Sequence, residues 1–104
     1  MRAASLLTLH PEGLYCPLGD FHIDPVRPVP RAVITHGHAD HARAGHDAVL
    51  ATPQTLAIMA ARYGAAFAAH TQALAYGDSV TMNGVEVRLA PAGQLGWGPA
   101  KAGG

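Results

Sequence analysis

The chain has 104 residues, of which 49% are hydrophobic and 13% charged, a composition that excludes an intrinsically disordered segment. Seven Lys and Arg residues balance seven Asp and Glu residues, so no overall positive field attracts nucleic acid. The length allows one small domain at most. A single cysteine, Cys16, excludes an internal disulfide, and no long apolar run indicates a signal peptide or a membrane span, so we expect a cytoplasmic protein.

Short strands and one helix are expected along the chain. Alternating or β-branched runs predict strands over residues 5–9, 13–16, 21–24, 32–35, 48–51, 72–76, 80–82 and 85–89. A helix is predicted over residues 53–63, because Thr52 offers a capping hydroxyl and Gly64 a stop. Asn83-Gly84 predicts a tight hairpin turn. Residues 94–104 are expected to form a Gly-rich tail without regular structure, and the fold class to be α/β (α+β).

The most informative segment is residues 36–41, which read His-Gly-His-Ala-Asp-His directly after a predicted buried strand. In a short loop, His36 and His38 can point the same way, and Asp40 and His41 can reach a neighbouring point. Imidazole nitrogen and carboxylate oxygen suit Zn²⁺ or Mn²⁺, and two such ions about 3.5–4 Å apart can clamp a hydrolysable group. The segment therefore predicts a two-metal hydrolase site with these four residues as ligands and Asp40 as a catalytic residue.

Asp24, which ends the strand predicted before this segment, is the second candidate catalytic residue. It could orient one of the metal ligands through a hydrogen bond. The alternative interpretation of the cluster is a solvent-exposed, His-rich loop that binds metal without further function. His10, His22 and His70 are each isolated in the sequence, so we expect them to be surface or hydrogen-bonded histidines rather than ligands.

Residues 36–41 resemble the HxHxDH motif of the metallo-β-lactamase superfamily. The stretches DPVRPVPRAVITHGHADHA, ATPQTLAIMAARYG and VEVRLAPAG extend the likeness, over residues 5 to about 93, to bacterial ligase-associated DNA exonucleases, which are relatives of RNA 3′-end-processing nucleases. The resemblance implies an αββα sandwich, a site for two divalent ions (Zn²⁺ or Mn²⁺), and hydrolysis of DNA or RNA phosphodiesters in DNA repair. It also implies functional association with a DNA ligase and a helicase, and none with a membrane.

The same resemblance implies roles for individual residues. His36 and His38 would hold one metal, Asp40 and His41 the other, and Asp24 would match the orienting aspartate of the family. After LAPAG the exonuclease group continues with a histidine that is a further metal ligand, whereas this chain has Gln94, and the later family motifs have no counterpart.

Residues 1–93 are therefore expected to be a partial, truncated domain, the N-terminal half of the sandwich, with weak or no activity. Two alternatives stay open. One is another hydrolase of the superfamily, such as a glyoxalase-type thioesterase, and the other is a non-catalytic metal-binding fragment. The stretch 24–31 and the predicted helix favour the nuclease.

Overall fold

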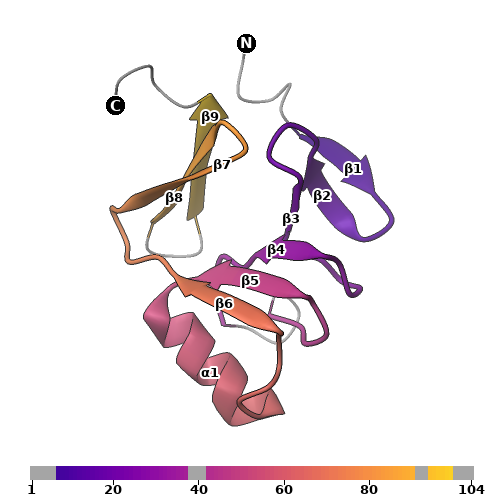
Figure 1. The fold of residues 1–104 in the computed structure, drawn as a ribbon, viewed down its shortest axis with the longest axis vertical. Helices are drawn as coiled ribbons and strands as arrows, with labels where there is room; N and C mark the ends of the chain where they lie inside the picture. Colours follow the sequence, from indigo (N-terminus) through magenta and orange to yellow (C-terminus); the bar gives the residue numbers. More distant parts are fainter. Residues whose placement is uncertain (1–6, 38–41, 91–93, 100–104) are drawn as a thin grey trace.

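The computed structural model describes residues 7–37, 42–90 and 94–99, the last of these ranges through its backbone alone. Two sheets and one helix make up this part of the chain (Figure 1). The larger sheet consists, in spatial order, of β1 (Thr8–His10), β2 (Gly13–Cys16), β3 (Phe21–Ile23), β4 (Arg31–Val33), β5 (Ala48–Ala51) and β6 (His70–Ala73). The smaller sheet consists of β7 (Ser79–Met82), β8 (Val85–Ala90) and β9 (Gln94–Pro99). The expected mixture of many short strands and one helix is confirmed.

The larger sheet changes from antiparallel to parallel pairing at β3. Strands β1, β2 and β3 pair antiparallel, whereas β3, β4, β5 and β6 pair parallel. Parallel strands end at the same edge of a sheet. The segment after β3 therefore lies beside the segment after β4, and the Asp24 amide donates to the carbonyl of Val33 at 2.9 Å.

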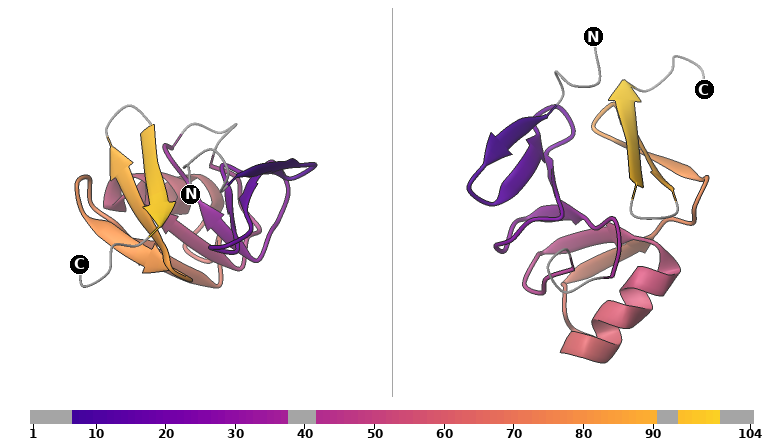
Figure 2. Two further views of the ribbon diagram at one scale, coloured as in Figure 1. Left: turned by 90° about the horizontal axis from the view of Figure 1, so that it is seen from above. Right: turned by 180° about the vertical axis from the view of Figure 1, so that it is seen from behind.

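The helix α1 (Pro53–Tyr63) covers one face of β4, β5 and β6 (Figures 1 and 2). Its bounds match the prediction, because the Thr52 hydroxyl accepts from the Thr55 amide at 3.2 Å and Gly64 ends it at a φ of +95°. Met59, a residue of this helix, is fully buried. The core on this face consists of Val29, Ala32, Ile34, Ala42, Val49, Ala51, Met59 and Phe67. Within the described ranges, no helix is long and apolar enough to cross a membrane.

The smaller sheet packs on the opposite side of the larger one (Figure 2). The core between the sheets consists of Cys16, Phe21, Ile23, Val33, Leu50, Leu74, Val85, Val87 and Leu89. The predicted turn between β7 and β8 is confirmed, with positive φ at Asn83 (50°) and Gly84 (82°). The Asn83 side-chain amide also donates to the carbonyl of Gly19 at 3.2 Å, which ties this hairpin to the turn between β2 and β3.

Several segments differ from the sequence-based expectation, among them Gln94–Pro99 and β6. Gln94–Pro99 is not an irregular tail but strand β9, antiparallel to β8 with Ala90 opposite Gln94. The reason is that β8 has a free edge of backbone donors and acceptors. Gln94–Pro99 can pair with this edge through its own backbone, independently of its side chains. Strand β6 begins at His70, two residues before the predicted start, because it follows β5 in parallel with Ala48 opposite His70.

Candidate metal centres

The structure describes two of the five predicted site residues, Asp24 and His36. His38, Asp40 and His41 lie outside the described residues. Asp24 directly follows β3 and His36 follows β4, and these strands are parallel neighbours. The sheet topology therefore brings the two residues to the same edge, at the carboxyl ends of the strands.

Thr35 connects the two residues. Its backbone amide donates to Asp24 Oδ1 at 2.7 Å, and its hydroxyl donates to Asp24 Oδ2 at 2.6 Å. Thr35 is buried, with 4% of its surface exposed. Asp24 has a φ of +45°, a left-handed conformation that aspartate tolerates better than most residues.

The hydroxyl of Thr35 also fixes the tautomer of His36. This hydroxyl gives its hydrogen to Asp24, so it can only accept in its 3.0 Å contact with His36 Nδ1. The proton of the neutral imidazole then lies on Nδ1, and Nε2 carries the lone pair that a metal ion needs. A hydrogen-bonded second nitrogen is usual for metal-ligating histidines, so His36 has the chemistry of a ligand.

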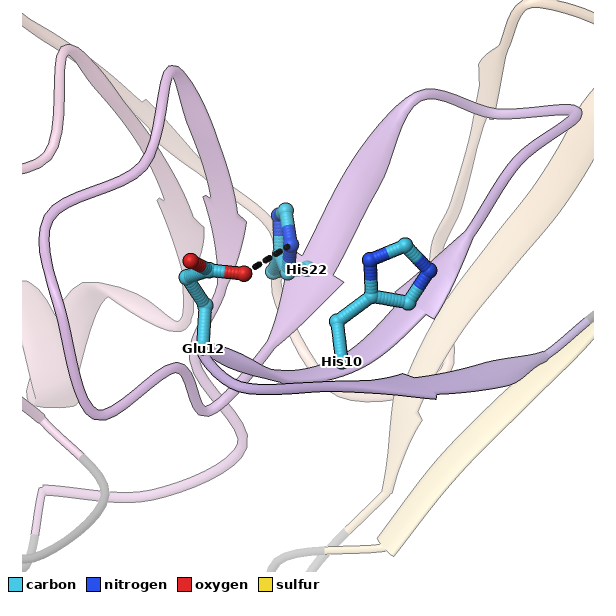
Figure 3. Close-up of side chains that lie close together, drawn as sticks. All are labelled: His10, Glu12 and His22. Carbon is cyan, nitrogen blue, oxygen red and sulfur yellow. Dashed lines mark ion pairs between the residues drawn. The ribbon is translucent and has the colours of Figure 1, made fainter.

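A second group of possible ligands lies on the antiparallel part of the larger sheet. One ligand atom from each of His10, Glu12 and His22 lies within 4.8 Å of the other two, so that the group could hold a metal ion (Figure 3). Glu12 Oε1 is 3.9 Å from His22 Nε2. His10 is exposed and contacts the Thr8 hydroxyl at 3.0 Å, as expected of a surface histidine, but its closeness to Glu12 and His22 was not predicted.

The register of three strands explains how the group forms. Thr8 lies opposite Tyr15, and Tyr15 lies opposite His22, so these positions share one face of the sheet. His10 is two residues after Thr8 and joins the same face. Alternation along β1 is visible in the sequence, but the register of β2 against β3 is not, so no local sequence pattern reveals this group.

Burial and ring contacts set the electrostatics of this second group. Burial lowers the pKa of His22, and the nearby Glu12 carboxylate opposes the shift without reversing it. The Tyr15 ring lies beside both histidines, with centroid distances of 5.0 Å to His10 and 4.6 Å to His22. The Tyr15 hydroxyl donates to Asp20 at 2.7 Å, and this hydrogen bond raises the pKa of Tyr15.

The described residues also line an open hollow of about 260 Å³. It lies at the start of the parallel strands, beside Arg31, Ala48 and His70, and reaches the β7–β8 hairpin. The carboxyl ends of β3 and β4, where Asp24 and His36 lie, are at the opposite edge of the sheet. The hollow thus contains none of the candidate ligands.

Comparisons of the chain with protein-family models, with curated proteins and with solved structures find no match. The likeness to metallo-β-lactamase-type nucleases therefore stays a prediction. The evidence for a function lies in the residues themselves: the spacing of residues 36–41 and the hydrogen bonds that run from Asp24 through Thr35 to His36.

Proposed function

We propose that the chain is a metal-dependent phosphodiester hydrolase of the metallo-β-lactamase kind, with its site at the carboxyl ends of β3 and β4. The observation that carries the proposal is the hydrogen-bonded series Asp24, Thr35 and His36, which sets the tautomer of a histidine in an HxHxDH segment. A surface loop that is merely rich in histidine would not require its first histidine to be hydrogen-bonded to a buried threonine, which is hydrogen-bonded in turn to a carboxylate.

The donor set fits divalent transition metals. His36 offers Nε2, and the spacing supplies His38, Asp40 and His41 as further ligands, a mixed nitrogen and oxygen set that suits Zn²⁺ or Mn²⁺. When bound, two such ions supply Lewis acidity to the oxygens of a phosphodiester. Asp24 and Thr35 hold the His36 ring in one orientation and its neutral form in one tautomer, so that this ligand needs no rearrangement.

Two further features are compatible with this proposal. The larger and smaller sheets pack on each other around an apolar core, and α1 covers the outer face of the larger sheet. An αββα sandwich would contain these layers. The likeness of residues 24–31 and of the helix to ligase-associated exonucleases supports DNA ends as the substrate and a DNA ligase and a helicase as functional partners.

The test is hydrolysis of end-labelled single-stranded DNA by the full chain, freed of metal and then supplied with Mn²⁺ or Zn²⁺. We expect slow hydrolysis, so enzyme in excess over substrate is the appropriate condition. His36→Ala should lower the rate by at least about tenfold, because loss of even an outer partner of a ligand costs that much. His70→Ala, on an exposed residue of β6, is the matched control and should keep the rate.

Three other outcomes would contradict the proposal or assign one of the alternatives. Equal rates for the chain and His36→Ala would contradict the proposal. Hydrolysis of a thioester but not of DNA would assign the site to a thioesterase instead. Metal binding that is lost in His36→Ala, without hydrolysis of either substrate, would leave a non-catalytic metal-binding protein.

A further inference from the structure

We propose that His10, Glu12 and His22 form a separate binding site for one divalent transition-metal ion of the Zn²⁺ class, and that this ion fastens the β1–β2 hairpin to β3. The residues come from three places: the end of β1, the turn before β2, and the middle of β3 (Figure 3). The site is distinct from residues 36–41 and does not depend on the proposed hydrolase function.

The first argument is an unsatisfied buried atom. His22 Nε2 is buried and has no hydrogen-bond partner among the described residues, and the whole side chain is 13% exposed. Its nearest opposite charge, Glu12 Oε1, is 3.9 Å away, too far for a hydrogen bond. A buried polar atom without a partner destabilises a fold, and a metal ion held between His22 and Glu12 would remove that cost.

The second argument concerns His10. Its Nε2 lies 3.0 Å from the Thr8 hydroxyl, and that hydroxyl donates to the carbonyl of Tyr15 at 3.4 Å. When the hydroxyl donates to Tyr15, it accepts from His10 Nε2–H, and the lone pair of His10 then lies on Nδ1. In Figure 3 one ring nitrogen of His10 faces His22 and the other points away. His10 is thus prepared as a ligand in the same manner as His36, through a threonine hydroxyl.

The third argument is charge and donor type. Two neutral imidazoles and one carboxylate give a net charge of −1 opposite a divalent cation. Imidazole suits Zn²⁺, Cu²⁺ and Ni²⁺, whereas Mg²⁺ and Ca²⁺ need more oxygen ligands than Glu12 alone provides. His₂Glu is a known zinc set, with the fourth position left to water on the exposed side of His10.

The site needs a small adjustment to close. Zinc–nitrogen bonds of about 2.0–2.1 Å at tetrahedral angles place ligand atoms about 3.3 Å apart, compared with separations of up to 4.8 Å here. His10 can supply the movement, because β1 is an edge strand whose three residues are all exposed. A hairpin at the edge of a sheet, in a chain with a single cysteine, is where a metal clip would add most to stability.

The test is binding of Co²⁺ and Zn²⁺ to the full chain and to site variants. Co²⁺ reports four-coordinate ligand sets through its visible absorption, and titration counts the sites. We expect His22→Phe and Glu12→Gln each to lose one equivalent of bound metal, or to lower the affinity for it by at least about tenfold. His70→Asn should bind like the unchanged chain. Excess Zn²⁺, about 100 times the dissociation constant, should raise the unfolding midpoint of the unchanged chain by about 10 °C or more.

The outcomes distinguish this site from the one at residues 36–41. His36→Ala should keep the equivalent that His22→Phe loses, and the double variant should lose both. His22→Phe removes the unsatisfied nitrogen and keeps a ring beside Tyr15, so it should fold at least as well as the unchanged chain without metal. Unchanged stoichiometry and affinity in both His22→Phe and Glu12→Gln would overturn the inference, whatever the result of the nuclease assay.

Discussion

Asp24 accepts two hydrogen bonds from Thr35, one on each carboxylate oxygen, at 2.7 Å from the backbone amide and 2.6 Å from the hydroxyl. Strands β3 and β4 end next to these residues, so the pair ties two neighbouring strand ends together. The same hydroxyl accepts from His36. The stability of this sheet edge and the orientation of the candidate ligand His36 therefore both depend on the hydroxyl oxygen of Thr35.

Thr35→Val should test this dependence. Valine keeps the shape of threonine but leaves Asp24 Oδ2 without its hydroxyl partner, which should lower the free energy of unfolding by about 1–3 kcal/mol. Metal affinity should fall in the same variant. Thr35→Ser, which keeps the hydroxyl, should change both much less. Urea denaturation and metal titration measure the two effects, and equal losses in the two variants would contradict the prediction, because the methyl group would then contribute as much as the hydroxyl.

Acid should weaken the fold through His46. This side chain is 2% exposed, its Nδ1 accepts from the Val29 amide at 3.1 Å, and burial, with a smaller contribution from His22, lowers its pKa. The unfolded chain binds a proton below about pH 6.5, while the folded chain resists it. Stability is therefore complete above that pH and declines as the pH falls toward the lowered pKa.

His46→Gln removes this titration but keeps a hydrogen-bond acceptor. The metal-free variant should lose less stability than the unchanged chain between pH 7.5 and pH 5.5, as measured by urea denaturation at each pH. Part of the decline should persist, because the pKa of His22 is lowered in the same direction. His70→Gln, at an exposed position, is the control, and an unaltered pH profile in His46→Gln would contradict the prediction.

Met59 should contribute more to stability than its neighbour Ile58. Met59 is fully buried between α1 and the larger sheet, whereas Ile58 is 43% exposed. Met59→Ala should cost about 2–5 kcal/mol, since it removes buried methylene groups and leaves a cavity. Ile58→Ala should cost about 1 kcal/mol or less. Chemical denaturation followed by circular dichroism compares them, and similar losses would mean that the helix packs differently.

Gly84 should tolerate asparagine better than alanine. Its φ is +82°, and no atom lies within 4 Å of the place that a Cβ would take, so only the backbone conformation opposes a side chain. Gly84→Ala should cost about 1–2 kcal/mol, and Gly84→Asn less, because asparagine visits the left-handed region more readily. Thermal unfolding of the two variants checks the order, and a larger loss for asparagine would contradict it.

Local signals in the sequence were sufficient for some elements and not for others. The bounds of α1 follow from Thr52, Pro53 and Gly64, which lie within the helix or next to it. The Asn83-Gly84 turn is equally local. Strand β9 depends on the free edge of β8, and no pattern within Gln94–Pro99 reveals that edge.

The two candidate metal centres show the same difference between local signals, which the sequence reveals, and contacts that depend on the fold. Residues 36–41 are contiguous, so their spacing is visible in the sequence, and the position of Asp24 beside them follows from the parallel pairing of β3 with β4. His10, Glu12 and His22 meet only through the register of three short strands, which tertiary packing decides.

Position 24 consequently has little freedom to vary. Its backbone lies at a φ of +45°, which glycine, asparagine and aspartate adopt at low cost. Its side chain must also present two acceptor oxygens, one to each donor of Thr35. Glycine adopts this φ but has no side-chain oxygens. Glutamate has two oxygens, but its side chain is one carbon longer and its backbone resists this φ. Asparagine has a single side-chain oxygen. A saturation library at this codon, selected for folded protein, should therefore return aspartate almost alone.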